Sequence, residues 1–247
     1  MNLGEKSFSL FKREVILYVL QIFTSAVIAR VLGPKLLGVA LILNMIPSYA
    51  ETFGRLKFDI AAVYYLGKNK YPLNEVIFTL NILALFSSSI VVLIFFVNFD
   101  FFSSILFSKT EQNVDNLVYV VLAQTPLSFI FMNYSYLFLF KEDTRNYNIM
   151  VVLKSLITSL LGIILVGFFN FGIMGVVLAS SFALLISVFF GVIKMGSKGT
   201  IYFNLNFKLI KDLTVYGSKL YFQGLITNLQ LYCLNLLVVF YLVPSQV

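Results

Sequence analysis

The 247-residue sequence contains no histidine, no tryptophan and a single cysteine, Cys233. One cysteine cannot form an internal disulfide bond. The lack of histidine removes the commonest general base and the commonest ligand of transition metals, so the composition gives little support to an enzyme. The sequence also has no metal-ligand motif and no glycine-rich phosphate loop, and we therefore expect neither a metal nor a cofactor.

Charged residues are scarce as well. They make up 12 % of the chain, against about 25 % in a typical soluble domain, whereas 60 % of the residues are hydrophobic. So few charges cannot cover a water-facing surface. The apolar runs are long and continuous rather than alternating, which is typical of helices and not of membrane barrel strands. The sequence thus predicts an all-α integral membrane protein.

Seven apolar runs are long enough to cross a bilayer, and they cover residues 15–32, 36–60, 76–97, 117–140, 149–169, 172–193 and 220–243. A crossing takes about 20 residues of helix. The short link 170–172 leaves room only for a tight hairpin between the fifth and sixth runs. Segment 203–219 is either a separate amphipathic helix on the membrane surface or an extension of the seventh run.

Basic residues mark the two sides of the membrane. With the N-terminus in the cytoplasm, all of the 18 basic residues fall on the cytoplasmic side except Arg30, Lys35, Lys109 and Lys154. Cytoplasmic loops of membrane proteins carry such an excess of lysine and arginine. The formal charge of +7 therefore indicates orientation, and we expect no nucleic-acid partner.

Ionisable residues within the apolar runs are costly in a bilayer and are candidates for function. Glu51, Arg55 and Asp59 are spaced so that one continuous helix would carry them on one face. They form either an ion triad that serves folding alone or the wall of a polar cavity, with Lys57 pointing elsewhere. Lys154 either reaches the nearby interface or lines the same cavity.

Residues 25–71, "SAVIARVLGPKLLGVALILNMIPSYAETFGRLKFDIAAVYYLGKNKY", resemble the N-terminal signature of polysaccharide (O-antigen type) flippases of the MOP exporter superfamily. In that signature a first helix ends in Ala-Arg-x-Leu-Gly-Pro, and a glycine follows about four residues on. The matching residues here are Ala29, Arg30, Leu32, Gly33, Pro34 and Gly38. The second helix of the signature then carries a glycine, an aliphatic run and a basic end, here Gly54 onward to Lys70.

The resemblance implies a fold of two helical bundles. Residues 1–200 would form an N-terminal bundle of about six helices, and residues 201–247 an amphipathic segment and the seventh helix, the start of a second bundle. Members of the family have twelve to fourteen helices, so we expect this chain to be a fragment. The resemblance also implies a multi-pass protein of the cell (plasma) membrane, and a bacterial source. Gly33 and Pro34 are expected to form the turn between the first two helices.

The function implied is the flipping of polyprenyl-diphosphate-linked oligosaccharides for cell-surface polysaccharide synthesis by alternating access. The partners would be that lipid-linked substrate, membrane lipids and proteins of glycan assembly. The candidate ligands of the diphosphate are Arg55, Arg30, Lys57 and Lys154, and the candidates for binding a coupling proton or sodium ion are Glu51 and Asp59. For Arg30, contact with lipid headgroups is the alternative.

Two other functions stay open. One is a multidrug or cation antiporter of the same superfamily, which would need an acidic cavity. The other is a membrane polysaccharide polymerase or acyltransferase, which the absence of histidine disfavours.

Overall fold

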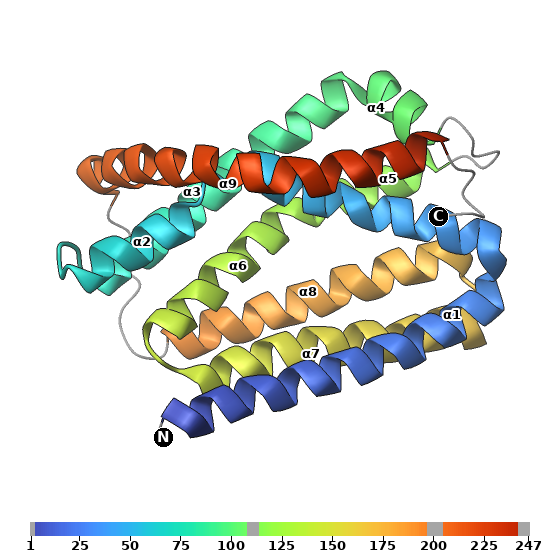
Figure 1. Cartoon of the computed structure of the whole chain (residues 1–247), viewed down its shortest axis with the longest axis horizontal. Helices are drawn as coiled ribbons and strands as arrows, with labels where there is room; N and C mark the ends of the chain where they lie inside the picture. The colour runs from blue at the N-terminus through green and yellow to red at the C-terminus, as the bar shows by residue number, and fades with distance from the viewer. Residues whose placement is uncertain (1–2, 108–113, 197–204, 242–247) are drawn as a thin grey trace.

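A computed structural model describes residues 3–107, 114–196 and 205–241 (Figure 1). Helices, short turns and connections make up these ranges, with no strand among them, which confirms the all-α class. Five helices in the described part are long and apolar enough to cross a membrane: Phe8–Gly54, Leu73–Val97, Asp115–Phe140, Thr144–Phe168 and Gly172–Gly196. The chain is thus a multi-pass membrane protein.

Helix α1 (Leu3–Gly54) contains the first predicted run and most of the second, folded back on each other. The reversal occurs at Gly33, whose φ of 74° and ψ of 170° are the non-helical angles inside α1. An L-residue rarely adopts a positive φ, so glycine fits this position. Pro34 follows directly and, having no N–H group, loses no helical hydrogen bond there. The predicted turn at Gly33 and Pro34 is confirmed.

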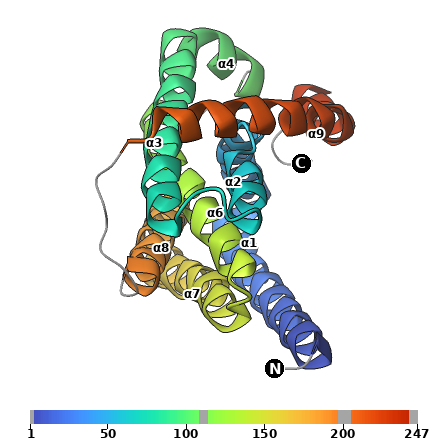
Figure 2. The ribbon, with the colours of Figure 1, turned by 90° about the vertical axis from the view of Figure 1, so that its left-hand side faces the viewer.

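The second predicted run is not one continuous helix. α1 ends at Gly54, and α2 (Phe58–Gly67) begins after residues 55–57, which we call the helix break. Lys57 adopts a left-handed conformation there, with φ 54° and ψ 31°. Helix α2 leaves the break at an angle to the second segment of α1 and runs toward the α2–α3 connection (Figure 1). Figure 2 shows the same helices from the side of that connection. The apolar stretch of the second run therefore ends in a separate short helix that extends to Gly67.

The other helices are α3 (Leu73–Val97), α4 (Phe99–Leu106), α5 (Asp115–Ala123), α6 (Thr125–Phe140), α7 (Thr144–Ile163), the π-helical turn η1 (Ile164–Phe168), α8 (Gly172–Gly196) and α9 (Phe207–Tyr241). α9 runs without interruption from the amphipathic segment into the seventh predicted run. Within the described residues, the amphipathic segment is thus an extension of the seventh run. Residues 203–204 of the segment and 242–243 of the run lie outside the described residues.

Helices α7 and α8 form the predicted antiparallel hairpin. Asn170 and Gly172 both have positive φ values, 54° and 56°, which let the chain reverse within the short link. Close packing of the pair depends on small residues of α8. A Cβ atom added at Gly175 would lie 3.1 Å from side-chain atoms of Leu165 and Val166. Small residues allow helices to approach in a membrane, where burial of apolar surface gives no advantage over lipid.

The connections lie at two opposite ends of the molecule. The N-terminal end of α1, the α2–α3 connection and the α6–α7 connection share one end, while the Gly33 bend and the α7–α8 turn share the other (Figure 1). Large apolar side chains on the first segment of α1 face outward, with Phe11, Ile22 and Phe23 between 62 % and 70 % exposed. Such exposure is typical of lipid contact rather than of a water-facing helix.

Candidate functional site: a cationic cavity at the helix break

The helix break brings a buried ion pair into the bundle. Arg55 lies in the break and is 6 % exposed, and Asp59 lies in the first turn of α2 and is 1 % exposed. Arg55 Nη2 and Asp59 Oδ2 are 3.2 Å apart. The guanidinium carbon also lies 5.7 Å from the ring centroid of Tyr136 on α6, within the range of a cation–π contact. Asp59 additionally faces the positive end of the α2 dipole.

The pair lies beside a cavity of about 190 Å³, which we call the break cavity. α1, the break, α6 and α9 line it through Glu51, Thr52, Arg55, Lys57, Met132, Tyr136, Tyr221, Gly224 and Leu225. Two of these residues are basic and one is acidic, so the lining itself carries a formal charge of +1. Asp59, the buried partner of Arg55, offsets that charge from behind the lining, so it is the side chains of Arg55 and Lys57 that can meet an anionic ligand in the cavity.

Hydrogen-bonding capacity in this region is not used up. Arg55 Nη1 and both carboxylate oxygens of Asp59 are buried and make no hydrogen bond with the described part of the chain. A buried guanidinium N–H without an acceptor is costly, and native structures supply one from water, an ion or a ligand. The cavity beside Arg55 has room for such an acceptor.

The break lies within the bundle and away from its ends. α2 has 10 residues between the break and the α2–α3 connection, which at 1.5 Å per residue is about 15 Å. Where a membrane protein has non-helical backbone inside its bundle, that backbone is buried in protein or lines a cavity. Discontinuous helices are a common element of transporter binding sites.

Helix α9 covers the break with one face. The Tyr221 hydroxyl donates a hydrogen bond of 3.2 Å to the carbonyl oxygen of Phe53, in the last turn of α1. Gly217 packs so closely that an added Cβ would lie 2.5 Å from the carbonyl oxygen of Leu56. At Gly224 an added Cβ would lie 3.7 Å from Lys57 Cε. Positions 217, 221 and 224 recur at helical spacing and form a single face.

The structure corrects the predicted ion triad. Because the helix breaks after Gly54, Glu51 and Asp59 do not share the face of one continuous helix. The Arg55–Asp59 pair forms across the break, and Glu51 lines the break cavity with Arg55 and Lys57. Lys57 was expected to point elsewhere and instead contributes to the same cavity.

Lys154 lies on α7, near but not among the lining residues of the break cavity. Its side chain is half-buried, and Nζ lies 4.8 Å from the ring centroid of Phe131. Within the described residues, Lys154 therefore does not line the break cavity with Arg55 and Lys57.

Arg30 is separate from this group. It is exposed and lies beside the Gly33 bend, with the whole second segment of α1 between it and Arg55. That segment, Pro34 to Gly54, spans about 30 Å at 1.5 Å per residue. Arg30 therefore does not line the break cavity, and the headgroup alternative suits its position. Gly38 is buried in the second segment and has no place in the cavity lining.

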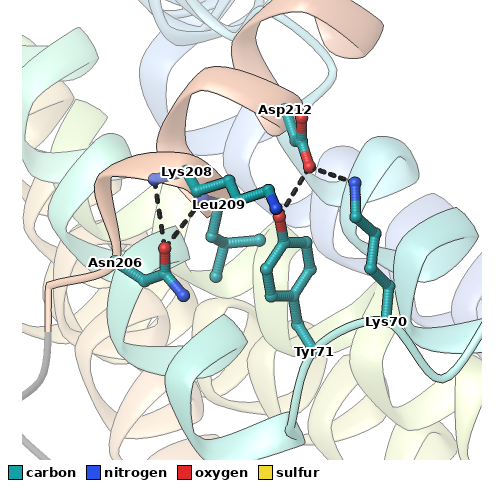
Figure 3. Close-up of polar contacts among 6 residues, drawn as sticks. All are labelled: Lys70, Tyr71, Asn206, Lys208, Leu209 and Asp212. Carbon is teal, nitrogen blue, oxygen red and sulfur yellow. Dashed lines mark hydrogen bonds and ion pairs between the residues drawn. The ribbon is translucent and has the colours of Figure 1, made fainter.

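A second polar cluster joins α9 to the α2–α3 connection (Figure 3). Asp212 Oδ2 accepts hydrogen bonds from Lys70 Nζ at 2.5 Å and from the Tyr71 hydroxyl at 2.6 Å; we call these three residues the α9 clamp. The two hydrogen bonds lower the pKa of Asp212 below its ordinary value, and the bond to Asp212 raises the pKa of Lys70. These contacts hold the beginning of α9 against the α2–α3 connection.

The first turn of α9 is capped. The side-chain oxygen of Asn206 accepts hydrogen bonds from the backbone N–H groups of Lys208 at 3.0 Å and Leu209 at 3.2 Å (Figure 3). Its amide nitrogen donates to Glu75 Oε2 at 3.2 Å. Nothing in the sequence predicted the residues of the clamp and the cap, or Tyr136 and Tyr221 in the cavity. The chain has 14 tyrosines and many polar residues, and no pattern distinguishes these positions from the others.

No group of three or more cysteine, aspartate and glutamate residues in the described ranges could hold a metal ion. Comparison with known proteins found no matching family model, no matching curated protein and no matching solved structure. The site's assignment therefore rests on its own geometry and on the residues of segment 25–71.

Proposed function

We propose that this chain acts in the membrane export of polyprenyl-diphosphate-linked oligosaccharides, which it helps to flip by alternating access for cell-surface polysaccharide synthesis. The observation that carries the proposal is the break cavity: a pocket inside a multi-pass bundle, lined by two bases and one acid, with a buried guanidinium N–H that has no acceptor in the described part of the chain. The signature-like residues of segment 25–71 support the same assignment.

The chemistry of a diphosphate suits this lining. A diphosphate carries two or more negative charges and cannot enter hydrocarbon without cations and hydrogen-bond donors. The planar guanidinium of Arg55 can bind two phosphate oxygens at once, while Lys57 supplies a second positive charge. The tyrosine hydroxyls of the cavity are of the type that binds sugar hydroxyls. Glu51 and Asp59 are the groups that we propose for a coupling proton or sodium ion.

The position of α9 fits alternating access. α9 covers the break on one side and is held by the α9 clamp at one end of the molecule. Movement of α9 relative to the other helices would open the cavity toward one side of the membrane. An antiporter of drugs or cations would instead need an acidic cavity, and the lining has one acid against two bases.

The test uses the gene that encodes this chain, expressed in full in cells that lack their own flippase and make a lipid-linked oligosaccharide. An impermeant glycan-labelling reagent reports how much oligosaccharide has reached the outer leaflet. The informative variant is Arg55→Gln combined with Asp59→Asn, which removes the cation together with the coupling candidate Asp59 and leaves no buried unpaired carboxylate. Arg30→Gln is the matched control, since it removes an exposed cation outside the cavity.

We expect wild type and the Arg30 variant to expose the glycan and the double variant to leave it inside. If the double variant, present in the membrane at normal amounts, exposes as much glycan as wild type, the cationic cavity does not bind the substrate. If wild type moves none of several glycans offered, the flippase proposal fails as a whole.

A further inference from the structure

A second concave site lies far from the break, at the N-terminal end of the bundle. It is a groove of about 370 Å³ between α1 and α7, which we call the α1–α7 groove. Its lining residues are Ser9, Lys12, Arg13, Ile16, Asn148, Ile149, Val152, Leu153 and Leu156. None of these lines the break cavity, so the groove needs an explanation of its own.

The polar end of the groove is organised around Arg13, whose side chain is 11 % exposed. Its guanidinium donates to Asn148 Oδ1 at 3.4 Å, pairs with the Glu14 carboxylate and lies 4.8 Å from the ring centroid of Tyr147. Asn148 in turn donates to the Ser9 hydroxyl at 2.8 Å. Another guanidinium donor, Arg13 Nε, is buried and has no hydrogen-bond acceptor in the described structure.

The other end of the groove is apolar. From Ser9 to Ile16 on α1, and from Asn148 to Leu156 on α7, the lining changes from polar to aliphatic within about two helical turns, roughly 10–12 Å. Helix α7 runs from this end of the bundle toward the opposite end (Figure 1), so the apolar wall extends into the bilayer. A groove with a polar end and an apolar wall is complementary to a lipid whose headgroup lies at the membrane interface.

The charge of the polar end selects among lipids. Among the described residues that line or pair with this end of the groove, Lys12 and Arg13 are basic and Glu14 is acidic, which leaves a net positive charge. Lys12 is exposed, with Nζ 4.6 Å from the ring centroid of Phe8, and can turn toward a headgroup. Basic pockets between transmembrane helices on the cytoplasmic side bind anionic headgroups. We propose that the α1–α7 groove binds an anionic phospholipid, with its phosphate on Arg13 and Lys12 and an acyl chain along Val152 and Leu156.

The chain offers a direct test because it contains no native tryptophan. Replacing Ile149, at the rim of the groove, by tryptophan (Ile149→Trp) places a single fluorophore at the site. The full chain is reconstituted in vesicles that contain dibrominated phosphatidylglycerol or dibrominated phosphatidylcholine, and quenching by each lipid gives their relative affinity. A second reporter, Phe189→Trp on α8, is 63 % exposed in the native chain and outside the groove.

We expect the groove reporter to favour the anionic lipid about tenfold and the α8 reporter to favour neither. Arg13→Gln should lower the groove preference about fivefold, the effect of losing one basic residue at a membrane surface. Arg145→Gln, which removes an exposed cation from the same end of α7, should leave the preference unchanged. Lys12→Gln alters an exposed side chain and gives the same test should the Arg13 variant fail to insert.

Three results would overturn the proposal. The first is equal quenching of the groove reporter by the two lipids in the wild-type background. The second is an unchanged preference in both the Arg13 and Lys12 variants. The third is loss of the preference when millimolar inorganic phosphate is added, because the groove would then be a site for free phosphate. None of these results bears on the break cavity.

Discussion

The contact between Gly217 and the helix break gives the sharpest prediction. A Cβ added at Gly217 would lie 2.5 Å from the Leu56 carbonyl oxygen and 3.4 Å from the carbonyl group of Lys57. Ordinary contact begins near 3.4 Å, so α9 and the break must separate by about 0.9 Å in Gly217→Ala. The obstacle is backbone rather than a flexible side chain, and such overpacking costs about 1–3 kcal/mol.

Gly224→Ala is the matched control. It lies two turns further along the same face, and its added Cβ would have Lys57 Cε, at 3.7 Å, as its nearest neighbour. Both variants gain about 1 kcal/mol from the better helix propensity of alanine. That gain cancels in the comparison. We therefore expect Gly217→Ala to be about 1–3 kcal/mol less stable than Gly224→Ala.

The assay is a titration with sodium dodecyl sulfate in mixed micelles, followed by a fluorophore on Cys233. This is the only cysteine of the chain, and it is exposed on α9. The shift of the unfolding midpoint between the two variants gives the difference in free energy of unfolding. Equal free energies would refute the reasoning, since α9 would then not contact the break at the distance described.

Three further predictions use the same titration. Tyr221→Phe removes the hydrogen bond to Phe53 and should lower the free energy of unfolding by about 1 kcal/mol; no change would mean that the bond is not formed. Arg55→Gln leaves the carboxylate of Asp59 buried without its partner and should lower the free energy of unfolding by about 3–5 kcal/mol. Adding Asp59→Asn should recover most of that loss. An equal loss in the single and the double variant would contradict a buried ion pair. The α9 clamp lowers the pKa of Asp212, so its contribution to stability is present above the ordinary carboxyl pKa and is lost as the pH falls through the lowered one. Wild type should therefore lose its advantage over Asp212→Asn in that acid range, and a pH-independent difference would count against the clamp.

Much of the fold follows from hydropathy. About 20 apolar residues are needed for each crossing, so the apolar runs located the third to sixth crossings within about five residues. The first and seventh helices begin well before their apolar runs, at Leu3 and Phe207, because their first turns carry polar residues. Gly33 was predictable because glycine followed by proline between two such runs leaves little besides a reversal. The hairpin at 170–172 was predictable because the link is too short for anything else.

The helix break was not predictable from the sequence. Pro47, the residue that ordinarily marks a break, remains inside a helix, and the chain breaks at Arg55–Lys57 instead. Lys57 adopts a left-handed conformation that a non-glycine residue keeps only when its surroundings impose it. Those surroundings include Gly217, about 160 residues later in the chain. Tertiary contact, rather than local propensity, fixes this part of the structure.

The sequence predicted the ion pair of the candidate site but not the rest of the cavity lining, which depends on tertiary contacts. The i, i+4 spacing of Arg55 and Asp59 correctly paired them, because Arg55 lies in the break and Asp59 follows it in the first turn of α2. The placement of Glu51 with Lys57 depended on the break itself. Tyr136 and Tyr221 reach the cavity from α6 and α9, and single positions among 14 tyrosines give no indication of that.

The α7–α8 hairpin and the α9 contact differ in how early each can form during synthesis. The hairpin joins neighbouring stretches of chain, and such local contacts form with little loss of chain entropy. The Tyr221–Phe53 hydrogen bond joins residues 168 positions apart. The hairpin is therefore complete before the ribosome has made α9, whereas the charged break stays uncovered until α9 inserts. Chains interrupted in that interval leave Arg55 and Lys57 without the face of α9 that covers them in the finished bundle.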